Sequence, residues 1–246
     1  MRISSNCTMA SWNFVDYPDT TIPFLPSLAG HLARSLSMKH HSRILWFIRH
    51  GERVDNVNKA WKITAERWDD PPLSPRGHQQ AREVGIALAD EPIDYIICSP
   101  FTRCVETATG ILSAKKIPPS VWIEPGLGES LNVCMSPPGR PTMEQIKKMN
   151  PYVDDTYEPV YSILPPEIGG DAGCIPRVIK TLRTILARYP TGEILYNLTD
   201  NIESSPNPSV SGNIMFISHG SPTAACHLAI CGSWKYVGQC TIGTTV

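Results

Sequence analysis

Two histidines, each followed by a glycine, stand shortly after apolar runs. His50 lies between Arg49 and Arg53 after the run at 44–48, and His219 follows a similar run that begins at residue 214. A neutral imidazole can attack phosphorus, and the planar donors of arginine match phosphate oxygens. This pattern predicts a phosphate pocket with a histidine nucleophile; the alternative is a pair of surface arginines beside a turn.

One further arginine and several glutamates could complete such a site. Arg103 falls in the first turn of a predicted helix after the strand at 93–98, and a helix N-terminus already favours anions. A departing ester oxygen needs a proton, which an acid tuned by burial can supply. Glu129 lies in a turn beyond a strand end, with Glu124 and Glu52 as rivals. The residues alone do not choose among the three.

Strands and helices must alternate to position these residues. The unbroken apolar run at 43–48 is typical of a strand buried on both faces. Further strands are predicted at 93–98, 121–124 and 214–218. Helices are predicted at about 73–90, from Ser99 with Pro100 in the first turn, from a capping box at Thr142, at 176–189 and at 222–231. The alternation predicts a three-layer α/β sandwich with a mostly parallel central sheet, in which ligands bind beyond the carboxyl ends of the strands.

The chain of 246 residues is long enough for one large α/β domain. Residues 1–42 show no sustained hydrophobic period, which predicts an irregular leader. The main domain is therefore expected at 43–246. Within it, the segment 132–175 is rich in proline and glycine and too long for a simple connection, which predicts a lid-like insertion. A second, polar insertion is expected at about 197–213.

Composition excludes several classes of function. The net charge of −1 provides no overall field that would recruit nucleic acid or an anionic membrane. No segment approaches the roughly 18 apolar residues that span a bilayer. The eight cysteines form no CxxC pair, which argues against a zinc ribbon. The N-terminus lacks the apolar region of a signal peptide, so a cytoplasmic location is expected.

The motifs together resemble the histidine phosphatase superfamily, whose fold is phosphoglycerate mutase-like. Four ordered matches carry the resemblance: Arg49-His50-Gly51, Leu73-Ser74-Pro75-Arg76-Gly77, Ser99-Pro100 with Arg103, and Ser218-His219-Gly220. The stretches 49–55 and 124–127 are more specifically similar to the branch that contains suppressors of T-cell receptor signalling (T-cell ubiquitin ligand proteins) and ecdysteroid-phosphate phosphatases.

The resemblance implies roles for particular residues. His50 is implied as the nucleophile and Glu129 as the proton donor. The residues implied around the phosphate are Arg49, Arg53, Arg103 and His219. The resemblance also implies no metal or other cofactor, and homodimers in that branch.

The expected activity is therefore phosphomonoester hydrolysis through a phosphohistidine intermediate, on phosphotyrosine-type protein substrates or small hydrophobic phosphate esters. A phosphoglycerate mutase is the first alternative, against which Arg53 and Ala60 argue, because mutases carry serine or threonine and arginine there. A catalytically weak phosphate-binding scaffold is the second, left open by the 197–213 insertion and the chain end at Val246. Three tyrosines of the 132–175 segment could stack on a leaving group or pack the segment itself: Tyr152, Tyr157 and Tyr161.

Overall fold

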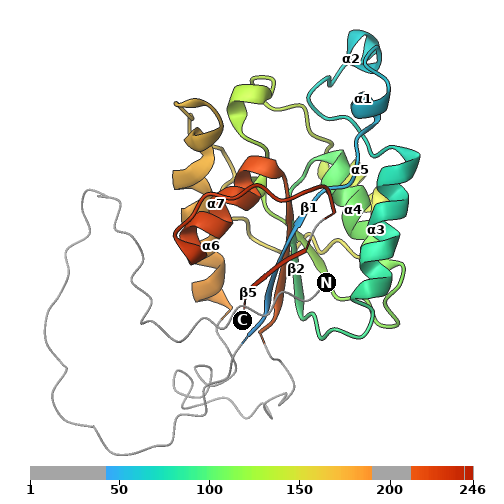
Figure 1. Ribbon diagram of the computed structural model, residues 1–246, viewed down its shortest axis with the longest axis vertical. Helices are drawn as coiled ribbons and strands as arrows, with labels where there is room; N and C mark the ends of the chain where they lie inside the picture. Colours follow the sequence, from blue (N-terminus) through green and yellow to red (C-terminus); the bar gives the residue numbers. More distant parts are fainter. Residues whose placement is uncertain (1–42, 190–211, 241, 246) are drawn as a thin grey trace, which may run out of the picture.

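A five-stranded sheet forms the centre of the computed structural model, which describes residues 43–189, 212–240 and 242–245 (Figure 1). The strands are β1 (Leu45–Arg49), β2 (Tyr95–Cys98), β3 (Val121–Ile123), β4 (Ile214–Ser218) and β5 (Ile242–Thr245), in the order β3-β2-β4-β1-β5. The first four run parallel, and β5 pairs antiparallel with β1 at one edge. The sheet is therefore mostly parallel, as predicted. The leader at 1–42 and most of the 197–213 insertion lie outside the described residues.

Helices cover both faces of this sheet. They are α1 (Val54–Val57), α2 (Trp61–Thr64), α3 (Pro75–Ala87), α4 (Thr102–Leu112), α5 (Met143–Met149), α6 (Ile175–Arg188) and α7 (Gly220–Cys231), with 3-10 turns η1 (Pro125–Leu127), η2 (Leu131–Val133) and η3 (Gly170–Cys174). Helices α3, α4 and α5 pack on one face, and α6 and α7 on the other (Figure 1). The three-layer prediction is confirmed. Within the described ranges, no helix is both long and apolar enough to cross a membrane.

Strand β1 shows why its apolar run is unbroken. Trp46 and Ile48 enter the core under α3 and α4, whereas Leu45 and Phe47 enter the core under α6 and α7. Successive side chains of a strand point to opposite faces, so a strand with helices on both sides needs an apolar residue at every position. Phe47 stacks on Phe216 of the neighbouring β4, with ring centroids 5.2 Å apart.

Side-chain caps set the helix starts that matter for the site. Ser74 accepts a hydrogen bond from Gly77 N at 3.0 Å at the start of α3, and the capping box predicted at Thr142 is present. The prediction of Pro100 in the first turn of α4 is wrong, because the helix begins at Thr102. The cap comes instead from a distant loop, since Thr102 N donates to Asp70 Oδ1 at 2.8 Å.

Two glycines join the loop after β1 to the start of α3. A Cβ atom on Gly51 would lie 2.7 Å from Gly77 O, and one on Gly77 would clash with Glu52 O. The two backbones can therefore touch only where both residues lack a side chain. Ser74 N also donates to Glu52 O at 2.8 Å. This contact explains why the two glycine motifs occur together, and it fixes the chain immediately after His50.

The segment 132–175 packs against the β3 edge of the sheet. Tyr157 stacks on Trp122 of β3 at 5.3 Å, and its hydroxyl donates to Glu124 Oε2 at 2.8 Å. Val153 forms a bridge with Val121. Of the three tyrosines expected either to pack this segment or to contact substrate, Tyr157 therefore has a packing role.

Candidate active site

The ends of three parallel strands bring the predicted residues together. Pairing of β1 with β4 aligns Arg49 with Ser218, which sets His50 beside His219. The two imidazole rings lie 5.4 Å apart between centroids, at 65°. Ser99 directly follows β2, and its Oγ lies 2.7 Å from His219 Nε2. Both histidines thus stand at the carboxyl edge of the sheet, where open α/β sheets bind ligands.

His50 is held as a neutral imidazole in one tautomer. Its Nδ1 lies 2.8 Å from Gly51 O, and because a carbonyl can only accept, Nδ1 must carry the proton. The lone pair of the neutral ring is therefore on Nε2. The side chain is 1 % exposed, and burial, followed by the nearby Arg103, lowers the pKa of His50 well below its ordinary value. A neutral ring with a free Nε2 lone pair is the form that can attack phosphorus.

His219 is buried in the same way. Its Nδ1 lies 3.6 Å from Glu129 Oε2, and the ring of Phe101 meets it edge-on at 5.0 Å. Burial is the main cause that lowers the pKa of His219 well below its ordinary value, and Arg103 and His50 add to the effect. Two neutral imidazoles therefore face the same space.

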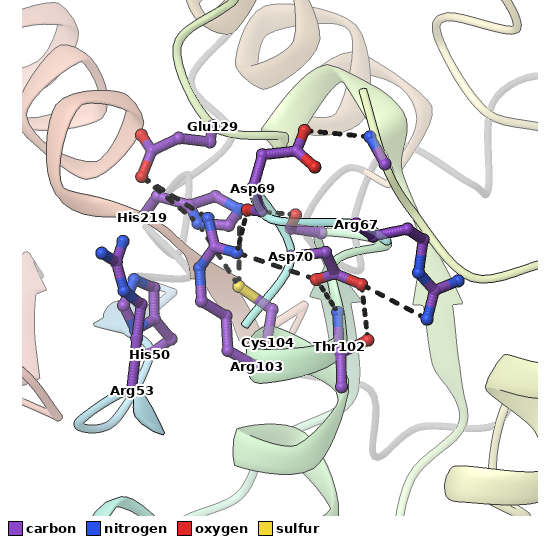
Figure 2. A network of polar contacts seen from close by, with 12 residues as sticks. His50, Arg53, Arg67, Asp69, Asp70, Thr102, Arg103, Cys104, Glu129 and His219 are labelled. Atoms are coloured by element: carbon purple, nitrogen blue, oxygen red, sulfur yellow. Dashed lines mark hydrogen bonds and ion pairs between the residues drawn. The ribbon is translucent and has the colours of Figure 1, made fainter. Parts of the chain in front are cut away.

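Arg103 lies in the first turn of α4, as predicted, and is 1 % exposed. Its Nη1 donates to Asp69 O at 3.0 Å and lies 3.7 Å from Asp70 Oδ1, while its Nη2 lies 3.7 Å from Glu129 Oε2. Figure 2 shows this guanidinium between Glu129, His219 and the two aspartates. The Nε atom is buried and has no hydrogen-bond partner among the described residues. An unsatisfied charged donor of this kind favours an anion beside it.

The two arginines around His50 are positioned differently. Arg53 donates from Nε and Nη2 to the two carboxylate oxygens of Asp55 at 2.8 and 2.9 Å, which leaves Nη1 outside the fork. Arg49 donates from Nη1 to Val237 O at 3.1 Å, and its Nε is a second buried donor with no partner within the described ranges. The structure thus brings all three predicted arginines to the histidines.

Only one of the three candidate glutamates reaches the histidines. Glu129 Oε2 lies between His219 and Arg103, as described above. Glu124 is fully buried and accepts from Gly126 N at 2.7 Å and from the hydroxyl of Tyr157. Glu52 accepts from the hydroxyl of Ser74 at 2.7 Å. Geometry therefore separates Glu129 from its rivals, as the family resemblance does and the residues alone do not.

The sequence did not predict a role for several residues of this network. Asp55 and Asp70 orient Arg53 and Arg103, and Ser99 contacts His219. Burial disfavours the charged form of the Asp70 carboxyl group and raises its pKa to about 6. Aspartate beside proline in a loop is typical of many turns, so the sequence offers no pattern that distinguishes this one.

The two histidines and Glu129 are also side chains of the kind that could bind a metal cation. The ligand atoms of His50, Glu129 and His219 all lie within 4.8 Å of one another. Three arginine side chains surround this group, however, and like charges repel strongly at such short range. The charge balance therefore favours an anion such as a phosphoryl group.

Comparisons with known proteins agree with this geometry. The model of the histidine phosphatase superfamily (branch 1) matches residues 45–197. The crystal structure of the ecdysone phosphate phosphatase from Bombyx mori in complex with tungstate has a TM-score of 0.60 at 22 % identity, covering 82 % of this chain and 88 % of that chain. This structural likeness supports the fold.

Two curated relatives are larger proteins. Human ubiquitin-associated and SH3 domain-containing protein A is 26 % identical over 246 residues, covering 85 % of this chain and 34 % of that protein. The ecdysteroid-phosphate phosphatase of Drosophila melanogaster is 32 % identical over 177 residues, covering 58 % of this chain and 23 % of that protein. The chain thus spans about a third or less of the length of these relatives. With a family model that matches most of its length, the chain belongs to branch 1 of the histidine phosphatase superfamily.

Proposed function

We propose that this chain is a phosphomonoester hydrolase that works through a phosphohistidine intermediate. The observation that carries the proposal is the state of His50, a buried neutral imidazole whose Nδ1 proton is committed to Gly51 O. Its Nε2 lone pair faces a site with two unsatisfied guanidinium donors, on Arg49 and Arg103. A nucleophile surrounded by anion-binding groups suits attack on a phosphoryl group.

In the first step, His50 Nε2 attacks phosphorus and the bond between phosphorus and the ester oxygen breaks. Arg49, Arg53 and Arg103 neutralise the negative charge on the phosphoryl oxygens, and His219 lies beside them. The carboxylic acid of Glu129 donates its proton to the departing oxygen, which leaves as an alcohol. In the second step, water attacks the phosphohistidine, the carboxylate of Glu129 takes the proton from that water, and inorganic phosphate and free His50 result. No step requires a metal ion.

The substrates we propose are phosphotyrosine-type or small hydrophobic phosphate esters. Tyr236 is 51 % exposed and donates to Asp171 Oδ2 at 3.0 Å. The adjacent Val237 accepts the hydrogen bond from Arg49, so this tyrosine lies at the rim of the phosphate site. An exposed ring there can stack on an apolar leaving group. The names of the ecdysteroid-phosphate phosphatases support an apolar ester, and we assign the lid-like segment 132–175 to the same specificity pocket.

The test is hydrolysis of an aryl phosphate by the wild type and by His50→Ala, with and without a chelator. We expect chelator-resistant turnover that His50→Ala abolishes. The matched control is His227→Ala, because His227 lies on α7 and bonds to Ser233 O outside the site; this variant should keep wild-type turnover. Normal turnover in His50→Ala would refute the mechanism. A folded wild type that binds phosphate analogues without turnover would instead indicate a scaffold.

A further inference from the structure

The loop that carries Glu129 is held by a buried ion pair that the proposed mechanism does not use. The pair joins Arg177, in the first turn of α6, to Glu167 of the 132–175 segment, with Arg177 Nε 2.6 Å from Glu167 Oε1. Both side chains are almost fully buried, at 1 % and 3 % exposed. We propose that this pair is a positioning device that fixes the proton donor Glu129 and makes its placement depend on the 132–175 segment.

Arg177 binds the loop through its carbonyl groups. Its Nη1 donates to Gly126 O at 2.8 Å and to Gly128 O at 3.0 Å, and its Nη2 donates to Glu129 O at 3.1 Å. Three of the four peptide groups from Gly126 to Glu129 are therefore fixed by a single rigid guanidinium. The planar geometry of arginine makes such a set of bonds possible, and a lysine could not reproduce it.

Glu167 binds the other side of the same loop. Its Oε2 accepts from Leu131 N at 2.8 Å and lies 3.5 Å from the hydroxyl of Ser130. The ion pair thus holds the backbone on both sides of Glu129, with carbonyls bound by the cation and an amide bound by the anion. Burying two charges costs free energy that their attraction only partly offsets, so stability alone is a weak reason for this pair.

The side chain of Glu129 has little else to hold it. Its Oε1 accepts from Ser130 N at 3.0 Å, while its contacts with Arg103 and His219 are longer, at 3.7 and 3.6 Å. A proton donor must come within hydrogen-bond reach of the leaving oxygen, and a misplacement of about 1 Å can cost about 100-fold in rate. The ion pair therefore acts on the chemistry through the backbone of Glu129, without touching the substrate.

The inference rests on the proposed role of Glu129, and leaving-group dependence tests it. The variants are Arg177→Met and Glu167→Gln, of which the second keeps the shape of the side chain. The variants are compared by kcat/KM, because this quantity reports on the steps up to and including departure of the alcohol. On an alkyl phosphate, whose leaving group needs a proton, we expect a loss of about tenfold or more. On dinitrophenyl phosphate, whose leaving group does not need one, the change should stay within about twofold.

Two surface variants provide matched controls. Arg188 lies on the same helix and also donates to a carbonyl of the 132–175 segment, Glu158 O at 2.7 Å, but it lies outside the Glu129 loop. Glu144 lies on α5 in an exposed pair with Lys148. Arg188→Met and Glu144→Gln should behave as the wild type on both esters. Equal losses on the two esters in the Arg177 and Glu167 variants would overturn the inference.

Two further measurements separate a positioning role from general damage. If Arg177 acts through Glu129, adding Arg177→Met to Glu129→Gln should cause no further loss on the alkyl ester; additive losses would contradict the inference. Amide hydrogen exchange over residues 126–131 should also accelerate in Glu167→Gln, with the other described regions unchanged. Hydrogen exchange requires no turnover, so unchanged exchange would refute the positioning role of the ion pair even if the wild type were inactive. An inactive wild type by itself would refute only the proposed function.

Discussion

Holding two histidines neutral should make the stability of this protein depend on pH in a specific way. Burial lowers the pKa of both His50 and His219 well below 6.5, the ordinary value. Below pH 6.5 the unfolded chain therefore binds protons that the folded chain does not, and the free energy of unfolding falls as the pH falls. Between about pH 7 and about pH 5.5, each histidine should lower the free energy of unfolding by about 1 kcal/mol.

Asp70 works in the opposite direction. Burial raises its pKa from 3.8 to about 6, so the folded chain binds a proton before the unfolded chain does, and stability rises as the pH falls through this range. Over the same interval Asp70 should raise the free energy of unfolding by somewhat less than about 1 kcal/mol. The two histidines therefore dominate, and these three groups together should destabilise the wild type by about 1–2 kcal/mol at the lower pH.

Urea unfolding at the two pH values, followed by tryptophan fluorescence, measures these contributions. On acidification, His50→Gln and His219→Gln should each lose about 1 kcal/mol less stability than the wild type, and Asp70→Asn should lose more stability than the wild type. The comparison with wild type cancels the titration of the remaining groups. If both histidine variants show the same pH dependence as the wild type, the two imidazoles are not held neutral, and the argument for a free Nε2 on His50 fails.

Three further substitutions test other parts of the site. Asp55→Asn breaks the two-bond fork to Arg53, so KM for an aryl phosphate should rise about tenfold with a smaller change in kcat, measured by steady-state kinetics. Gly77→Ala forces a Cβ into the backbone after β1; thermal unfolding should show a loss of about 1–3 kcal/mol, and unchanged stability would contradict the close approach. Ser99→Ala removes the 2.7 Å contact with His219, and kcat should fall about tenfold while the fold, checked by circular dichroism, persists.

The sequence predicted the parts of the fold that follow from local pattern. Strand β4 has the predicted bounds, 214–218, and the helix now assigned as α6 differs by one residue at each end. The apolar patterns of these elements match a strand buried on both faces and a helix with one apolar face. Strand β5 was not predicted, because Ile242-Gly243-Thr244-Thr245 has no such pattern. Its formation depends on pairing with β1, which the local sequence does not encode.

The site divides in the same way. Histidines and arginines at strand ends could be located because the carboxyl ends of parallel strands meet. The choice of Glu129 over Glu124 came from the family resemblance and not from the residues alone, because Glu124 is set apart by the hydrogen bond that it accepts from the distant Tyr157. The cap of α4 was missed for a similar reason, because Asp70 lies 32 positions before Thr102. Contacts between loops that are far apart in sequence determined each of these outcomes.

The position of β1 in the sheet also affects synthesis of the chain. Its two neighbours, β4 and β5, both come from residues after 213, and Ile44 bonds to Asn213 across 169 positions. While the ribosome makes the intervening chain, this apolar strand, which directly precedes His50, has no partner on either edge. Unpaired apolar strands promote aggregation. We therefore expect the nascent chain to expose the apolar residues 45–49 until residues 214–245 have been made.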